Sequence, residues 1–139
     1  MNPSFRPSAG ELVAAARAAR ERAYAPYSGF RVGAALLTTQ GDLITAANVE
    51  NASYGLAICA ERSAVVAAVA AGSRSFVAVA VAGNGPDPVT PCGACRQVLR
   101  EFPNGPELEV LCAGESGDQL LTTTLGALLP QSFGPEDLQ

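Results

Sequence analysis

Four segments of the chain have the composition and end signals of helices. The first begins at a capping box formed by Ser8 and Glu11, continues through an Ala-, Leu- and Arg-rich run to about Tyr24, and ends before Pro26. The second has the composition of a buried helix, and the third and fourth are short. These three are predicted over residues 59–71, 92–102 and 125–129.

Five other segments are short and apolar, as β-strands are. The first two flank a turn at Gly41-Asp42 and predict a hairpin. The third is continuously apolar, which is typical of a strand covered on both faces. The predicted strands are 31–38, 43–50, 76–81, 107–113 and a weaker 119–123. Because strand–helix–strand crossovers place helices on the faces of a sheet, this order predicts a single α/β domain over residues 1–139. We expect a three-layer α/β/α sandwich with a mixed sheet of about five strands.

The composition removes several kinds of chemistry. The chain of 139 residues has no histidine, no tryptophan and no lysine, and its nine basic residues are all arginine. Without histidine there is no Ser-His-Asp or Cys-His nucleophile, and without lysine there is no Schiff base or P-loop cation. Carboxylates, cysteines, hydroxyls, arginines and the backbone must therefore supply any chemistry.

Charge and hydropathy indicate partners and compartment. The net charge is -4 and no basic stripe is visible, so we expect a small uncharged substrate and no nucleic acid. No apolar run is long enough for a membrane span, and the N-terminus, with Pro3 and Arg6, lacks a signal-peptide core. We therefore expect no membrane contact and a cytoplasmic location. Charged residues make up only 16% of the chain, against roughly 25% in typical soluble domains, which favours an oligomer.

Three of the four cysteines lie where a loop meets a predicted helix. Cys59 opens the second helix, and Cys92 and Cys95 open the third. Helix starts favour thiolates, and both helices flank one strand, so the three thiolates can converge above one sheet edge. Three thiolates bind zinc with a fourth position open, as catalytic zinc requires. Cys112 lies inside an apolar strand, where we expect it in the core.

Glu61 lies two positions after the first of these cysteines. A carboxylate at a helix start is favoured by the helix dipole alone, or it serves as a base beside a metal-bound water. Cys59-x-Glu61 followed by Pro91-Cys92-x-x-Cys95 matches the zinc-deaminase pattern, for which three cysteines are one of the ligand sets. A C-x-x-C by itself fits a redox motif equally well. The upstream C-x-E therefore favours a deaminase.

Further motifs extend this pattern along nearly the whole chain. They are Pro26-Tyr27-Ser28, Phe30-Arg31-Val32-Gly33-Ala34-Ala35, Asn48-Val49-Glu50-Asn51, Cys59-Ala60-Glu61-Arg62, Pro91-Cys92-Gly93-Ala94-Cys95-Arg96-Gln97-Val98 and Ser132-Phe133-Gly134-Pro135-Glu136-Asp137-Leu138. With them the chain closely resembles the cytidine deaminases of the homotetrameric class. It departs from them at Ala47, where many relatives carry cysteine, and at Gly55, where proline is frequent. Neither departure touches a proposed role.

This resemblance implies an activity, a cofactor and partners. The implied activity is hydrolytic deamination of cytidine and deoxycytidine to uridine and deoxyuridine plus ammonia by a zinc-bound hydroxide, in pyrimidine salvage. The implied cofactor is one Zn²⁺ per chain. The implied partners are a small-molecule nucleoside substrate and three further copies of the chain, a homotetramer whose sites are completed by neighbouring subunits.

The resemblance also implies roles for individual residues. The implied zinc ligands are Cys59, Cys92 and Cys95. The implied substrate-binding residues are Phe30, Asn48, Glu50, Tyr54, Ala60 and Phe133. Within this set Asn48 and Glu50 hold the ribose, and Tyr54 and Phe133 complete the site of a neighbouring subunit. Glu61 is the implied proton shuttle.

Arg62 is the best candidate to donate hydrogen bonds to a zinc-bound thiolate and so to offset the charge of three thiolates on one ion. The alternative for Arg62 is an ion pair at the surface.

Three other functions of the protein also stay open. One is a deaminase of a cytosine nucleoside antibiotic or analogue, and another is a non-enzymatic zinc module with Cys112 as fourth ligand. The last is a thiol redox protein that uses Cys92 and Cys95.

Overall fold

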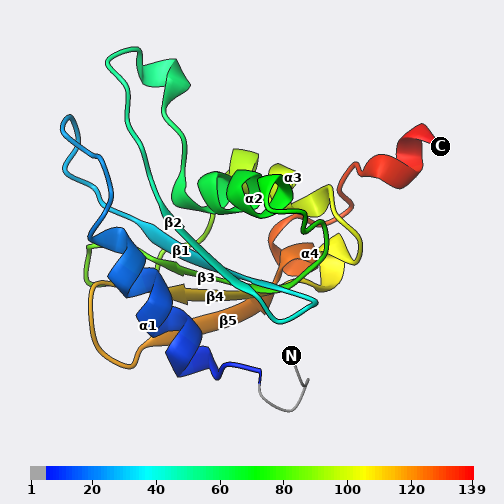
Figure 1. The fold of residues 1–139 in the computed structure, drawn as a ribbon, viewed down its shortest axis with the longest axis horizontal. Coiled ribbons are helices and arrows are strands. Elements are labelled where there is room, and N and C mark those ends of the chain that lie inside the picture. Colours follow the sequence, from blue (N-terminus) through cyan, green and yellow to red (C-terminus); the bar gives the residue numbers. More distant parts are fainter. Residues whose placement is uncertain (1–5) are drawn as a thin grey trace.

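A mixed five-stranded sheet is the middle layer of the structure, a computed structural model that describes residues 6–139 (Figure 1). The strand order is β2-β1-β3-β4-β5, in which β3 and β4 are parallel and all other neighbours are antiparallel. The strands are β1 (Gly33–Thr38), β2 (Leu43–Ala47), β3 (Phe76–Ala82), β4 (Glu109–Ala113) and β5 (Leu120–Thr124). The predicted mixed sheet and the predicted hairpin of the first two strands are confirmed.

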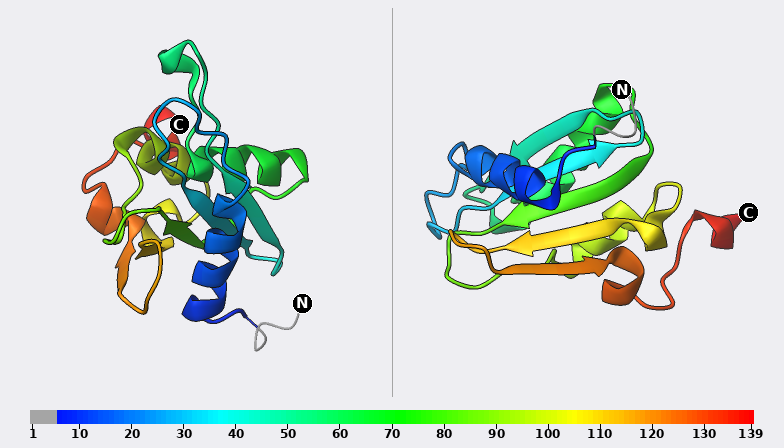
Figure 2. Two further views of the ribbon diagram at one scale, coloured as in Figure 1. Left: turned by 90° about the vertical axis from the view of Figure 1, so that its left-hand side faces the viewer. Right: turned by 90° about the horizontal axis from the view of Figure 1, so that it is seen from below.

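Helices cover both faces of this sheet, which confirms the predicted three layers. α1 (Ala9–Arg20) lies on one face, and α2 (Ala60–Ala70) and α3 (Gly93–Arg100) lie on the other (Figure 2). The short α4 (Leu125–Leu128) follows β5 directly. None of the described helices is both long and apolar enough to cross a membrane.

The two faces of the sheet carry side chains of different size. Toward α1 the central strands present mostly alanine, and Gly33 stands where a Cβ would come within 1.9 Å of the carbonyl oxygen of Ala16. These small residues let the α1 backbone lie close to the sheet. Toward α2 and α3 the same strands present larger side chains, including Leu36, Val79 and Val81. The two helices on this face therefore stand on a thicker apolar layer.

The first helix is shorter than predicted. Its capping box of Ser8 and Glu11 is confirmed, but it ends at Arg20 and not near Tyr24. The Tyr24 N–H donates to the Asn48 carbonyl at 3.0 Å, and the Tyr24 carbonyl accepts from the Glu50 N–H at 2.8 Å. The chain leaves the helix early because the backbone of this segment pairs with a distant part of the sequence.

Other predicted ends shift by a few residues. β2 stops at Ala47 and not at Glu50, and residues 48–58, here called the arm, project beyond the sheet (Figure 1). The arm carries a 3-10 turn at Tyr54–Leu56 inside a segment that we expected to be a plain loop. The third helix ends at Arg100, and residues before β4 form another 3-10 turn, Gly105–Glu107. The C-terminal tail, which includes Pro135–Leu138, extends at the opposite end of the long axis from the arm (Figure 1).

Candidate active site

The starts of α2 and α3 meet beyond the carboxyl end of β3. α2 precedes β3 and α3 follows it, and each helix runs antiparallel to the strand between them, so both N-termini reach the same sheet edge. Cys59 and Cys92 are the N-cap residues of the two helices, and Cys95 lies in the first turn of α3. The fold thus brings together three thiols from two distant segments of the chain.

These three thiols have the spacing of a zinc ligand set. All three Sγ atoms lie within 4.8 Å of one another, with 3.8 Å between Cys59 and Cys92 and 3.4 Å between Cys92 and Cys95. Tetrahedral zinc with Zn–S bonds of about 2.3 Å places its sulfur ligands about 3.8 Å apart. Three thiols at this separation fit Zn²⁺ and leave one tetrahedral position for another ligand.

Cys112 lies outside this cluster. Among the described residues, the group that could hold a metal contains only the other three cysteines. Cys112 is fully buried in β4 within the core that faces α2 and α3, which confirms the predicted core position. Burial raises the pKa of its thiol to about 11, so it stays protonated at neutral pH.

Glu61 stands beside the thiols on the wall of a cavity of about 500 Å³. The cavity is lined by Phe30, Val32, Asn48, Cys59, Ala60, Glu61, Val81, Pro88, Val89, Thr90 and Cys92. The Glu61 side chain belongs to the first turn of α2 and only 4% of the residue is exposed. Burial raises the pKa of this carboxyl to about 7, and the nearby Cys59 thiolate acts in the same direction.

Arg62 supplies positive charge to the same thiols. Its Nη2 donates to the Cys59 Sγ at 3.5 Å. Hydrogen bonds from Cys95, Arg62 and Cys92 lower the pKa of Cys59 to about 5. The hydrogen bond between Cys95 and Cys59, together with burial, raises the pKa of Cys95. The expected arginine–thiolate contact is therefore present, and among the described residues no ion pair is formed by Arg62.

Of the residues expected to bind substrate, Phe30, Asn48 and Ala60 line this cavity. The Asn48 amide is fixed on both sides, since its Oδ1 accepts from the Val32 N–H and its Nδ2 donates to the Phe30 carbonyl, both at 2.9 Å. Phe30 as a whole is 44% exposed although it lines the cavity. The three side chains thus share one opening with the thiols and Glu61.

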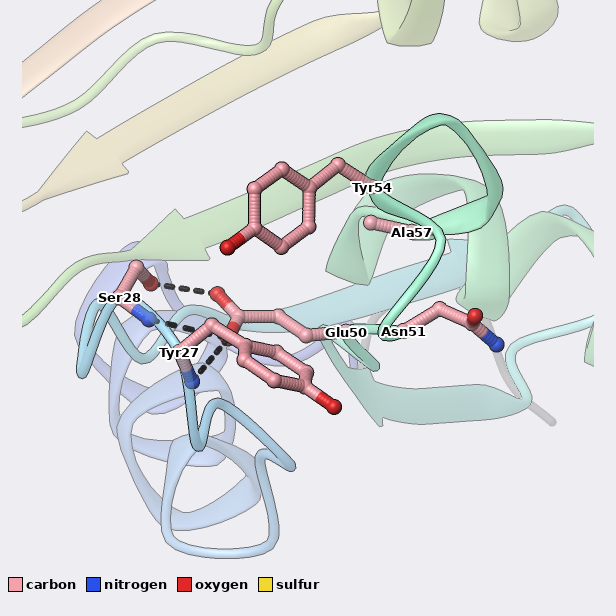
Figure 3. A pocket seen from close by; sticks show the side chains of 6 residues that line it. All are labelled: Tyr27, Ser28, Glu50, Asn51, Tyr54 and Ala57. Atoms are coloured by element: carbon pink, nitrogen blue, oxygen red, sulfur yellow. Dashed lines mark hydrogen bonds between the residues drawn. The ribbon is translucent and has the colours of Figure 1, made fainter.

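Glu50 lines a neighbouring pocket of about 340 Å³ instead. Figure 3 shows its carboxylate turned toward Tyr27 and Ser28, with the ring of Tyr54 opposite. Asn51 and Ala57 complete the lining. The structure therefore places the two residues expected to hold the ribose on adjacent pockets, joined by the chain from Asn48 to Glu50.

Tyr54 and Phe133 do not line the cavity that holds Glu61. Tyr54 is 76% exposed at the tip of the arm, where its ring packs edge-on against Tyr27 at 5.8 Å. Phe133 is 57% exposed on the C-terminal tail, and its carbonyl accepts from Gln97 Nε2 at 2.9 Å. Both residues are exposed, Tyr54 on the arm and Phe133 on the tail next to α3.

Sequence reasoning missed part of the cavity wall. Val32, Val81 and the segment Pro88-Val89-Thr90 line it, but they received no role. The last segment directly precedes the Pro91-Cys92 motif, and this adjacency was the available signal. Arg96 holds it in place, since its guanidinium donates to the Pro91 carbonyl at 2.7 Å and to Thr90 Oγ1 at 3.1 Å.

Comparisons with known proteins agree with this geometry. Residues 7–107 match the family described as cytidine and deoxycytidylate deaminase zinc-binding region. The chain is 48% identical over 128 residues to a protein of Sporosarcina psychrophila named cytidine deaminase, covering 92% of this chain and 93% of that protein. It is 48% identical over 127 residues to a cytidine deaminase of Halalkalibacterium halodurans, covering 91% and 95%.

Solved structures give the same result. A crystal structure of cytidine deaminase from Burkholderia pseudomallei superposes with a TM-score of 0.86 at 52% identity, covering 91% of this chain and 100% of that chain. The fold and the site thus define a zinc-dependent deaminase. The chain belongs to the cytidine and deoxycytidylate deaminase family.

Proposed function

We propose that the protein hydrolyses cytidine and deoxycytidine to uridine and deoxyuridine, with release of ammonia, in pyrimidine salvage. The observation that carries this proposal is the cluster of three thiols, two of which line a cavity of about 500 Å³ together with Glu61. That volume lies within the usual range for small-molecule sites. The relatives named cytidine deaminase, which match nearly the whole chain, support the choice of substrate.

The three clustered cysteines would hold the zinc ion. Zinc bound there supplies Lewis acidity, which lowers the pKa of a coordinated water to about 7. Three thiolates carry more negative charge than one divalent ion neutralises. Arg62 offsets part of it through its hydrogen bond to Cys59 Sγ, and the N-termini of α2 and α3 add positive potential.

Glu61 would carry the protons of the reaction. Its carboxylate takes a proton from water and delivers it to N3 of the cytosine ring, which makes C4 electrophilic. The water oxygen, now a hydroxyl, bonds to C4. Glu61 then takes the remaining proton of that hydroxyl and passes it to the amine nitrogen as the C4=O bond forms and the C4–N bond breaks. Water is consumed, and uridine and ammonia leave. General acid–base catalysis of this kind contributes about 10²- to 10⁴-fold.

The remaining residues would position the nucleoside. Phe30 and Ala60 contact the pyrimidine ring, and Asn48 and Glu50 hold the ribose. Asn48 is suited to this because its amide is already fixed by two backbone hydrogen bonds, so little side-chain entropy is lost on binding.

We also propose that residues 1–139 form one deaminase domain that assembles into a homotetramer. Exposed aromatic and aliphatic side chains gather on the arm and the 24–30 loop and support this assembly: Tyr24, Tyr27, Phe30, Val49, Tyr54, Leu56 and Ile58. In the tetramer Tyr54 and Phe133 would complete a neighbouring subunit's site. A cytoplasmic location is part of the same proposal, because in a reducing compartment clustered cysteines bind metal more often than they form disulfides.

The decisive experiment measures cytidine-dependent ammonia release and zinc content on the same sample. We expect one zinc per chain and turnover of both nucleosides. Glu61→Gln should keep the zinc and lower kcat by at least 10²-fold, because it removes the proton carrier but no ligand. Glu115→Gln, which changes an exposed glutamate in the loop before β5, is the matched control and should match the wild type.

Other outcomes separate the remaining functions. A zinc-loaded protein that ignores both nucleosides but deaminates a cytosine nucleoside antibiotic would replace this proposal with that activity. One tightly bound zinc per chain would contradict a thiol redox role for Cys92 and Cys95, because such a role needs those thiols free.

A further inference from the structure

One serine hydroxyl connects the arm to the wall of the substrate cavity. Ser28 Oγ donates to Glu50 Oε2, as the dashed line in Figure 3 shows. The same oxygen accepts from the Phe30 N–H at 3.0 Å. Ser28 thus contacts both a residue of the neighbouring pocket and the backbone of a residue that lines the cavity.

The hydrogen bonds of Glu50 leave its carboxylate a single free acceptor position. An ionised carboxylate has about four lone-pair sites. Oε1 accepts from the Tyr27 N–H at 2.9 Å and from the Ser28 N–H at 3.2 Å, which occupies its capacity. Among the described residues, Oε2 accepts from the Ser28 hydroxyl alone. One site on Oε2 therefore remains for a hydroxyl donor of a ligand.

From these contacts we infer that Ser28 is a positioning residue for the nucleoside, because its hydroxyl orients the Glu50 carboxylate and holds the Phe30 backbone at the same time. The inference rests on the proposed function, in which Glu50 faces the sugar and Phe30 faces the pyrimidine ring. Removal of the hydroxyl frees a second site on Oε2, so that the carboxylate is oriented only by the two backbone N–H groups that donate to Oε1.

The turn that follows Ser28 depends on the same hydroxyl. Gly29 has φ of +70°, a conformation that other residues rarely adopt, and it lets the chain reverse so that the Phe30 N–H points back at Ser28 Oγ. Asn84 Nδ2 holds the Gly29 carbonyl at 2.9 Å. The loop is therefore anchored by a residue of the segment after β3, and among the described contacts Ser28 is the residue of this loop whose side chain bonds to Glu50.

Ser28→Ala tests this inference in the full-length zinc-loaded protein. We expect KM for cytidine to rise about tenfold, the effect of losing one hydrogen bond to a charged group, while kcat stays within about twofold. Zinc content and Tm should not change, because Ser28 is an exposed loop residue. Ser28→Thr keeps the hydroxyl and should restore KM to within about twofold of wild type. Ser116→Ala, at an exposed serine of another loop, is the control.

A double-mutant comparison shows whether the effect passes through Glu50. The dissociation constant of the product uridine, measured by calorimetry, gives a readout that needs no turnover. Ser28→Ala should weaken uridine binding about tenfold in the wild-type background and less than about twofold in the Glu50→Gln background.

Three results would overturn the inference: an unchanged KM in Ser28→Ala, a fall confined to kcat, or the full tenfold loss in the Glu50→Gln background. Failure of the proposed function looks different. In that case the wild type itself would release no ammonia from either nucleoside and would not bind uridine.

Discussion

The start of α1 and the starts of α2 and α3 have nearly the same backbone but different N-cap residues. Ser8, Cys59 and Cys92 occupy the N-cap positions with ψ of 164°, 156° and 167°. Ser8 accepts from the Glu11 N–H and completes a capping box. Within the described chain, neither cysteine side chain makes a capping hydrogen bond to a backbone N–H of its own helix.

This difference distinguishes the helix-capping role of Ser8 from the proposed metal-ligand role of Cys59 and Cys92. A serine or aspartate at an N-cap stabilises a helix by about 1 kcal/mol relative to alanine. α2 and α3 lack that contribution because their caps present sulfur toward a common point. The cap of α1 contributes to stability, whereas at the starts of α2 and α3 we propose that cysteines replace better capping residues in order to bind a metal.

The largest effect is expected from Cys92→Ser, which places the better cap at a ligand position. Zinc content should fall to near zero and cytidine deamination should fall by more than 10³-fold, because serine is a poor zinc ligand at neutral pH. In the metal-free state, however, the variant should be as stable as metal-free wild type or more stable. Zinc analysis and thermal unfolding with and without a chelator measure both. A variant that keeps zinc and activity would show that Cys92 is not a ligand.

The next effect is expected from Arg62→Gln. Loss of its bond to Cys59 Sγ should weaken zinc binding or activity about 10- to 100-fold, the usual size for a residue that contacts a metal ligand. Competition with a chromogenic chelator measures the affinity. Arg74→Gln, at an exposed arginine after α2, should behave as wild type. Equal zinc affinity and equal cytidine deamination in both variants would leave Arg62 without a role at the site.

Cys112→Ala distinguishes the core cysteine from the ligand cysteines. We expect zinc content and kcat to stay unchanged and the free energy of unfolding to fall by about 1–2 kcal/mol, because the change leaves a small cavity in the core under α2 and α3. Denaturant unfolding and zinc analysis on one preparation check both values. Loss of zinc would instead support the four-cysteine module.

Ser8→Ala removes the cap from the helix that has no ligand role. Stability should fall by about 1 kcal/mol, with zinc content and kcat unchanged. Denaturant unfolding of the zinc-loaded protein is the measurement. A change in kcat would mean that the two faces of the sheet are coupled more closely than their separate cores indicate.

The smallest effect is the pH dependence of the same cap. Hydrogen bonds from the Ser8 backbone and side chain lower the pKa of Glu11 below its ordinary value. A carboxylate with a lowered pKa stabilises the fold above its ordinary pKa, and that contribution disappears as the pH falls through the lowered value. The stability difference between wild type and Glu11→Gln should therefore be present at neutral pH and vanish in acid, as measured by urea unfolding across the range.

Local signals were sufficient for several of these features. The capping box of Ser8 and Glu11 is predictable because both partners lie within one helical turn. The meeting of Cys59 with Cys92 is predictable because two helices that flank one strand begin at the same sheet edge. The end of α1 is not predictable from local signals, because the Tyr24 backbone pairs with residues more than twenty positions away.

Side-chain hydrogen-bond networks between loops could also not be predicted from the sequence. Ser28 belongs to a recognised motif, but its bonds to Glu50 and Phe30 depend on the turn at Gly29 and on the return path of the arm. The place of Glu50 in a pocket beside the main cavity follows from the same bonds. Conformations of this kind are set by tertiary contacts and leave no periodic pattern.

The separation of the proposed zinc ligands along the chain has a consequence for folding. Cys59 and Cys92 are 33 positions apart, and the segment between them contains all of α2 and β3. A metal ion that joins them closes a loop of that length and works as a reversible cross-link. For a covalent bridge, closure of such a loop removes chain entropy from the unfolded ensemble and so raises its free energy by an amount on the order of 3–4 kcal/mol. In a reducing compartment, where disulfides do not persist, metal ligation can constrain the central part of this chain in the same way.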